Sequence, residues 1–441
     1  MIEWTSSFIS AVCVVWILSA LTMPAGIGGG ILFVPIMRIL GGLAQGASSA
    51  LSQVLITGSA LGSILFQLLW QMRFPEEPML AQPYYVVLML PALLSGSLIG
   101  VYLSNLFPAV VCLMVLVCLC AVSSVLILKK GFETYGKENK IKHAKALLIN
   151  EQIAIPSPIR AADRGISMVS IEVGINVHPE TGMYYEIEER PPPIENSTAL
   201  PSPSGSVRSY SNVVQHPRME KLEEDHKLKS NGLMQRLIKS TPTFVAFTGL
   251  YWTFFALCTL VRGSRRRPSF TGLTPCGAGY WSVAGIQAAV GLLVALAVGS
   301  KEIKLIGITF LTGLLATVSG ASGGIILNPI LLERGLDPQQ TSATSTIMTL
   351  AMASCSALDF LASGRLEPLA ASLMGVTLIG SAIGMTLVTW LVKALGRQSI
   401  LVFLLGGMVI IGGLLLVYIG VKDVLLQYQE GSSPFAFGYL C

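Results

Sequence analysis

Two stretches decide how this chain folds: "GIGGGILFVP" at Gly26–Pro35 and "GASGGIILNP" at Gly320–Pro329. Each places a cluster of glycines and then a proline inside a long apolar segment, and neither contains a charged residue. Glycine weakens a helix because it has the most backbone freedom to lose, and proline removes a backbone donor. Each stretch therefore predicts a helix that is interrupted within an apolar environment.

The two stretches belong to an internal repeat. The segment from Gly26 to Ser48 aligns without a gap on the segment from Gly320 to Ser342, with nine identical pairs that include glycines, a proline and a glutamine. Each copy runs on into a helix rich in serine and threonine. Because a fixed offset over this length is typical of duplication, the chain is predicted to contain two homologous halves.

Composition places both halves in a membrane. Of the 441 residues, 52% are hydrophobic and only 12% are charged, whereas a soluble domain has about 25% charged residues. The sequence predicts an all-α integral membrane protein with about 8–10 membrane-spanning segments. The candidate segments are 8–40, 46–70, 83–103, 108–128, 243–261, 280–299, 303–333, 340–362, 368–392 and 399–421.

The first and seventh of these segments are too long for one straight span, so each is expected to be a broken helix or a re-entrant pair. If both cross the membrane, the repeats are parallel; if both turn back, the repeats are inverted. The sequence leaves both alternatives open. We favour the inverted arrangement, because broken helices at a midplane site recur in it.

Four regions follow from the pattern of apolar and polar residues. Residues 1–128 form the first membrane repeat, 129–240 a long hydrophilic loop, 241–425 the second repeat with extra leading helices, and 426–441 a tail. Proline, serine and charged residues dominate the loop, which is therefore expected to be mostly disordered. Lysines directly after residue 128 predict a cytoplasmic loop, but the arginines that begin at Arg262, one span later, conflict with the same rule.

Two halves that each contain a discontinuous helix are typical of a secondary transporter with its substrate at the repeat interface. A helix that restarts after a break presents free N–H groups and a positive dipole end, which attract anions. The expected partners are a small anionic solute and the lipid bilayer, not nucleic acid. The candidate substrate-binding residues are Gly26, Gly28, Gly29, Gly30, Pro35, Ser48, Ser52, Ser319, Gly320, Ser322, Gly323, Gly324, Asn328, Pro329, Ser342 and Ser345.

The two motifs together resemble the sulfite exporter TauE/SafE family, particularly its longer eukaryotic members. The resemblance rests on Gly26–Pro35 and on "GLLATVSGASGGIILNPILLERGLDPQQTSATST" at Gly313–Thr346. It implies transport of sulfite, organosulfonates or related small anions. The second half departs from the family's glycine-rich run at Ser319, Ala321 and Ser322, which puts identical selectivity in doubt.

The glycines, the serine and threonine hydroxyls and Asp359 each have a structural explanation beside the functional one. Glycine clusters also allow helices to pack closely, and serine or threonine hydroxyls often bond to carbonyls of their own helix. Asp359 is a candidate for coupling transport to a proton, because acids within membrane segments are often functional. The alternative is an interfacial acid paired with a nearby base, and Arg365 follows six residues later.

Gly320–Gly323 also resembles the nucleophile motif of rhomboid intramembrane proteases. A serine nucleophile needs a histidine base, but His143, His178, His216 and His226 all fall in the hydrophilic loop. We therefore expect no enzyme, no catalytic residue, no cofactor and no metal, and the eight cysteines show no spacing that predicts a disulfide. A membrane receptor or scaffold that acts through regulatory partners of the 129–240 loop is the remaining alternative.

Overall fold

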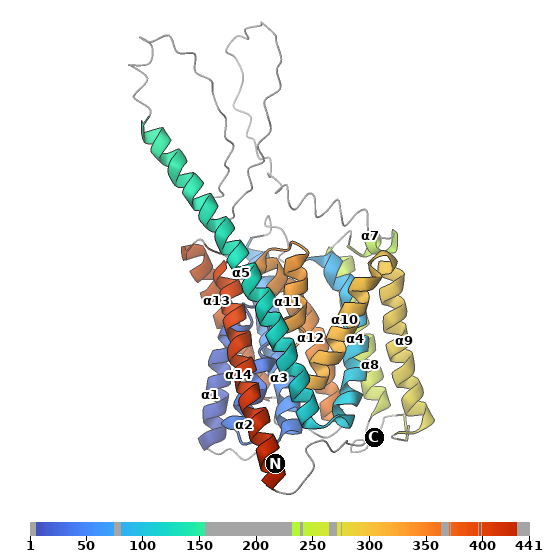
Figure 1. The fold of residues 1–441 in the computed structure, drawn as a ribbon. Coiled ribbons are helices and arrows are strands. Elements are labelled where there is room, and N and C mark those ends of the chain that lie inside the picture. The colour runs from blue at the N-terminus through green and yellow to red at the C-terminus, as the bar shows by residue number, and fades with distance from the viewer. Residues whose placement is uncertain are drawn as a thin grey trace, which may run out of the picture. The chain divides into compact units, whose positions relative to one another are not determined.

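The structure is a computed structural model that describes residues 6–74, 81–154, 232–238, 241–263, 271–274, 276–362, 370, 372–395, 397 and 399–429. All regular elements of these residues are helical (Figure 1). The helices are α1 (Ser6–Thr22), α2 (Gly30–Ile39), α3 (Gln45–Arg73), α4 (Pro83–Leu106), α5 (Ala109–Ala154), α7 (Gly232–Ile238), α8 (Thr241–Arg262), α9 (Ala278–Gly299), η1 (Ser300–Glu302), α10 (Ile303–Ser319), α11 (Gly324–Glu333), α12 (Pro338–Ala362), α13 (Leu373–Leu395) and α14 (Ser399–Gln429).

The chain divides into two compact units. Unit 1 comprises Met1–Glu138 and Lys229–Cys441, and unit 2 comprises Asn139–Leu228. Within the described residues, eight helical stretches are long and apolar enough to cross a membrane. One of them, Ala278–Ser319, contains both α9 and α10 with the short η1 turn between them. These features confirm the predicted all-α membrane fold.

Both glycine-rich stretches separate the two arms of a helical hairpin. Arg334, just after α11, forms an ion pair with Glu302, just before α10, at 3.1 Å. The chain therefore returns to the end of the helical body from which α10 started. Neither α10, with 17 residues, nor α11, with 10, is long enough to span a bilayer alone.

The first hairpin is built in the same way. α1 runs parallel to α13, because Gly380 and Gly384 lie against successive turns of α1. α2 runs parallel to α14, because its last turn pairs with Asp423 near the end of α14. α14 turns back on α13, and Val392 and Leu401 pack in one cluster at that turn. α1 and α2 are therefore antiparallel. The chain enters the body through α1 and leaves it through α2 at the same end.

The hairpins enter the body from opposite ends (Figure 1). Five spanning helices, namely α3, α4, α5, α8 and α9, lie between them in the chain. This is the inverted alternative of the two left open by the sequence. In this arrangement α3, α4 and α5 correspond to α12, α13 and α14, and α8 and α9 are the additional helices that precede the second repeat.

Helix packing repeats the same symmetry. The segment "GSLIG" at Gly96–Gly100 in α4 corresponds to "GSAIG" at Gly380–Gly384 in α13. A Cβ atom at Gly96 would lie 2.0 Å from the carbonyl oxygen of Phe310 in α10, and one at Gly384 would lie 1.8 Å from that of Ala20 in α1. Backbones that approach this closely need glycine, which is the small-residue rule of membrane helices.

Three boundaries differ from the prediction. α5 continues to Ala154 although the loop was expected to begin at residue 129. Lysine, glutamate and alanine favour helix despite their polarity, and Lys130 and Glu133 form an ion pair along the helix at 3.3 Å. α7 lies within the expected loop, and α14 extends to Gln429. The rest of the loop, 155–231 and 239–240, and the tail from 430 lie outside the described residues.

The expectation of no disulfide is wrong for one cysteine. Cys276, just before α9, is disulfide-bonded. Sequence spacing missed this bond because it can detect only frameworks of regularly placed cysteines, whereas a single bond depends on tertiary contacts.

Candidate functional site

The first break is a tight turn between α1 and α2. Gly26, Gly28 and Gly29 have φ angles of 75°, 76° and 80°, a region that side chains of L-residues rarely adopt. The N–H of Gly26 donates to the Met23 carbonyl at 2.8 Å, and that of Ile27 donates to the Thr22 carbonyl at 3.1 Å. The Gly29 carbonyl then accepts the first hydrogen bonds of α2. The sequence thus ends one helix and starts the next within seven residues.

The second break repeats this turn bond for bond. The N–H of Gly320 donates to the Thr317 carbonyl at 3.2 Å, and that of Ala321 donates to the Ala316 carbonyl at 2.9 Å. The Gly323 carbonyl accepts the first hydrogen bonds of α11. Gly320 again has a positive φ of 74°. Gly323 differs from its counterpart Gly29, because its φ of −62° is right-handed.

Each break leaves four successive N–H groups available. Within the described residues, the N–H groups of Gly28–Ile31 and of Ser322–Ile325 donate no hydrogen bond. All of these residues are buried. N–H groups of a first helical turn carry the positive end of the helix dipole. Two such groups of donors form a site that is chemically suited to an anion.

The two groups of donors lie against each other. A Cβ atom at Gly30 would lie 3.1 Å from the backbone nitrogen of Ser322, and one at Gly324 would lie 2.1 Å from the carbonyl oxygen of Gly26. The hydroxyl of Ser322 donates to the Ile27 carbonyl. The N-termini of α2 and α11 therefore approach closely, and their like dipole ends favour a negative charge between them.

Side chains from the opposite half bind the carbonyl groups of each break, so those carbonyls do not compete for the free N–H groups. Ser342 donates to the Pro24 carbonyl at 2.9 Å, and Asn328 donates to the Ala25 carbonyl at 3.1 Å. Ser52 donates to the Gly320 carbonyl at 3.1 Å. The same role is taken at longer distances by Ser345 on Gly26 and by Gln53 on Ala321.

The remaining candidate residues take structural positions. Ser319 donates to the Leu315 and Ala316 carbonyls of its own helix, which is the helix-internal alternative. Ser48 is buried in the first turn of α3. Pro35 and Pro329 are buried inside α2 and α11, each five residues after the first helical glycine. They mark the restarted helices and contribute no donor.

Sequence reasoning missed Thr349. This residue is fully buried in α12, and its hydroxyl has no hydrogen-bond partner among the described residues. Its methyl group would lie 3.0 Å from a Cβ atom at Gly28, so it borders the first break. Buried oxygens of Gln53 and Asn328 are likewise without a partner in the described part of the chain. The repeat could not reveal Thr349, because Leu55 occupies the corresponding position.

Asp359 lies away from the breaks, in the last turn of α12. It is buried and forms an ion pair with Arg262 at the end of α8. The base suggested by sequence proximity, Arg365, lies outside the described residues. The described residues contain no group of three or more side chains that could bind a metal ion.

Comparison with known proteins gives relatives along almost the whole chain. "Sulfite exporter TauE/SafE family protein 5" of Arabidopsis thaliana is 24% identical over 458 residues, which cover 98% of this chain and 87% of the relative. Family protein 3 of the same plant is 26% identical over 440 residues, covering 94% of this chain and 79% of the relative. No family model and no solved structure matches the chain.

Proposed function

This chain is assigned to the sulfite exporter TauE/SafE family, and we propose that it carries small anions of the sulfite and organosulfonate class across a membrane. Its multi-pass helical body and its relatives support a membrane transporter. The observation that carries the choice of an anion is the pair of closely packed breaks, at which eight buried backbone N–H groups donate no hydrogen bond within the described residues.

Sulfite suits such a site. Its three oxygens accept several hydrogen bonds at once, and each hydrogen bond to a charged group contributes about 1.5–3 kcal/mol. Backbone donors bind oxygen without demanding a particular substituent, so an organosulfonate could use the same groups. The hydroxyl of Ser322, where the first break has Gly28, gives the two breaks different chemistry and provides a basis for selectivity.

The inverted repeats provide a mechanism of alternating access. One hairpin opens toward each end of the body, and each packs on a helix of the other half: α1 on α13, and α10 on α4. The hydrogen bonds from Ser342 and Asn328 to the first break, and from Ser52 to the second, join the halves at the centre. Exchanging which hairpin separates from its partner helix exposes the same donors to opposite sides.

Uptake into proteoliposomes tests this function. The purified chain is expected to transport sulfite above the level of empty vesicles, with sulfate, thiosulfate and taurine as competitors that define the class. Gly29→Leu should abolish uptake, because φ is 80° there and a Cβ atom would lie 2.4 Å from the Phe33 ring. Gly375→Leu is the matched control, since nothing lies within 4 Å of a Cβ atom at that position. Equal uptake by both variants would exclude the breaks as the site.

Removing residues 155–231 distinguishes a transporter from a scaffold that acts through the loop. A transporter built from the helical body should keep its sulfite uptake after this deletion, whereas a scaffold that acts through the loop has no uptake to keep. The variant Ser322→Gly distinguishes a transporter from a serine hydrolase. This variant reproduces the residue of the first break, so uptake should persist where a serine nucleophile would be lost.

We also propose that the body end from which α10 enters faces the cytoplasm. Basic residues gather at the helix ends on that side, in agreement with the positive-inside rule. They include Lys129, Lys130, Lys301, Lys304, Arg334 and Arg397. Cys276, which is disulfide-bonded, directly precedes α9. Because α9 starts at the opposite end of the body (Figure 1), the bond is at the end expected to face an oxidising compartment. Arg262 does not contradict this orientation, because it is a buried ion-pair partner and not a loop residue.

A further inference from the structure

A buried ion pair lies within the helical body, far from both breaks. Arg262 of α8 is 3% exposed and Asp359 of α12 is 7% exposed. Asp359 lies ten residues after Thr349, which borders the first break, and this separation corresponds to ~15 Å along a helix. The pair thus lies near the membrane end where α8 and α12 finish. A charged pair held inside a membrane protein is a functional hypothesis by default, because apolar residues would serve as well for stability.

The arginine has donors to spare. Its Nη2 binds Asp359, whereas its Nε and Nη1 have no hydrogen-bond partner among the described residues. Two aromatic rings hold the guanidinium in place, since its carbon lies 5.2 Å from the ring centre of Tyr102 and 5.4 Å from that of Tyr280. These cation–π contacts fix the position of the charge without occupying the N–H groups.

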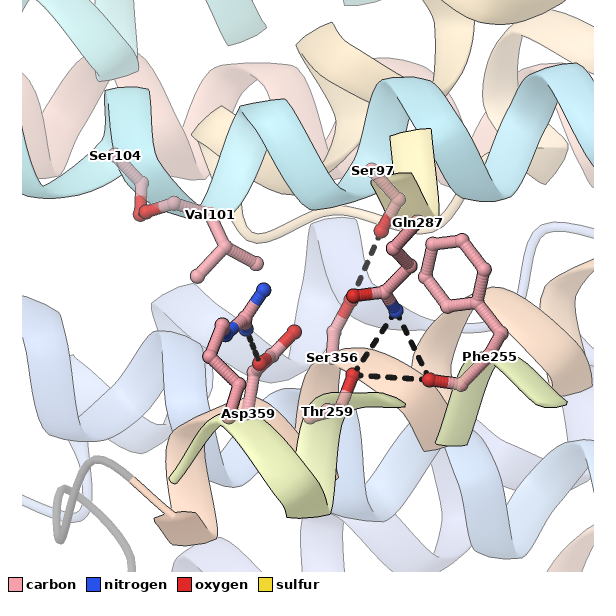
Figure 2. A network of polar contacts seen from close by, with 9 residues as sticks. Ser97, Val101, Ser104, Phe255, Thr259, Gln287, Ser356 and Asp359 are labelled. Atoms are coloured by element: carbon pink, nitrogen blue, oxygen red, sulfur yellow. Dashed lines mark hydrogen bonds and ion pairs between the residues drawn. The ribbon is translucent and has the colours of Figure 1, made fainter. Parts of the chain in front are cut away.

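A line of buried hydroxyls leads from the region of the second break toward this arginine. Thr317, three residues before Gly320, donates to Ser97 of α4 at 3.0 Å, and Ser97 lies 3.2 Å from the hydroxyl of Ser356 in α12. Asp359 follows Ser356 by one helical turn on the same face. Figure 2 shows Ser97, Ser356 and Asp359 in this order between the helices.

Polar groups of two further helices meet the same region. Gln287 of α9 donates to the Phe255 carbonyl at 2.9 Å and lies 3.3 Å from the hydroxyl of Thr259, one turn before Arg262 in α8 (Figure 2). Both side chains are buried. Five helices, α4, α8, α9, α10 and α12, therefore contribute polar side chains to one line that leads from the centre of the body to one end.

We propose that Arg262 is a second anion-binding residue on the route between the central breaks and this end of the membrane, and that Asp359 is its resident counter-ion. The proposal rests on the transport function proposed above. An oxyanion that leaves the backbone donors meets the free Nε and Nη1 groups of Arg262. The oxyanion then competes with the carboxylate for the guanidinium, so the ion pair holds the arginine in position between transport cycles and limits its affinity for the oxyanion.

The test is the sulfite concentration that gives half-maximal uptake into proteoliposomes. Arg262→Gln should raise this concentration by about tenfold or more, because a charge-assisted contact is lost. Asp359→Asn should lower it, because the competing carboxylate is gone. The double variant, which leaves no unpaired charge and is therefore expected to fold, should behave like Arg262→Gln. Arg38→Gln and Asp423→Asn are matched controls from a partly exposed ion pair that links α2 and α14, and both should leave the concentration unchanged.

A purely structural pair gives a different pattern. Both single variants would then shift the half-maximal concentration in the same direction or not at all, and the double variant would return to the wild-type value. Either result overturns the proposal. These failures are distinct from failure of the proposed function, in which the wild-type chain itself takes up no anion.

Discussion

At the scale of single residues, Gly28 and Gly323 differ in how strictly their positions require glycine. Gly28 has a φ of 76°, and a Cβ atom there would lie 2.7 Å from Ser322. Gly323 has an ordinary right-handed backbone, and its nearest neighbour would lie 3.4 Å away. Sequence alignment marks both as glycine-rich break positions, but only the turn geometry separates the one that must be glycine from the one that need not be.

Alanine substitution is predicted to separate these two glycines. Gly28→Ala should lower the free energy of unfolding by at least about 1–2 kcal/mol, the cost of a left-handed backbone for a residue with a side chain, and should strongly reduce sulfite uptake. Gly323→Ala should leave both nearly unchanged. The measurements are thermal unfolding in detergent and uptake by proteoliposomes. Equal loss in the two variants would mean that the turn geometry does not decide function.

The residues that sequence reasoning could not find at this scale depend on tertiary pairing. Arg262 precedes Asp359 by 97 positions, and only the packing of α8 on α12 brings them together. Thr349 is one of many hydroxyls in α12, and nothing in its spacing distinguishes it from those that bond to their own helix. Duplicated positions were recoverable from the sequence, whereas positions unique to one half were not.

At the scale of elements, glycine contacts determine which helices lie together. α4 receives α10 at Gly96 and Gly100, and α13 receives α1 at Gly380 and Gly384. The spans themselves were predictable because apolar length alone defines them. The end of α5 was not predictable from the sequence, because its lysines and glutamates are hydrophilic, as in a loop, and are also good helix formers.

The packing of α10 on α4 gives a second prediction. Gly96→Ala should destabilise the protein by about 1–3 kcal/mol, because the added methyl group overlaps the Phe310 carbonyl and forces the helices apart. Gly375→Ala, on the open face of α13, should have little effect. Thermal unfolding in detergent measures both. A stable Gly96→Ala variant would contradict the close approach of the two backbones.

At the scale of the whole molecule, the repeats are inverted because each hairpin turns back within the body. The sequence predicted the duplication and both breaks, but it left parallel and inverted topologies open. The decision depends on whether the residues between the helices, 23–29 at the first break and 320–323 at the second, reverse the chain. That reversal follows from φ angles and hydrogen bonds that composition does not encode.

Cysteine labelling tests this topology. Ala44 after the first hairpin and Lys304 in the first turn of α10 are both exposed. In a variant whose free cysteines are replaced by serine, Ala44→Cys should react with an impermeant maleimide from outside intact cells. Lys304→Cys should react only after the cells are permeabilised. Reaction of both from one side would mean that the hairpins enter from the same face and that the repeats are parallel.

Binding of an anion by the backbone donors of both breaks is tested most directly by nuclear magnetic resonance of the protein labelled with ¹⁵N at glycine. Addition of sulfite should shift the amide signals of Gly28, Gly29, Gly30, Gly323 and Gly324, whose N–H groups are free. The signals of Gly26 and Gly320, whose N–H groups donate to Met23 and Thr317, should stay in place. Unchanged signals from the five free amides, in protein that transports sulfite, would contradict the account.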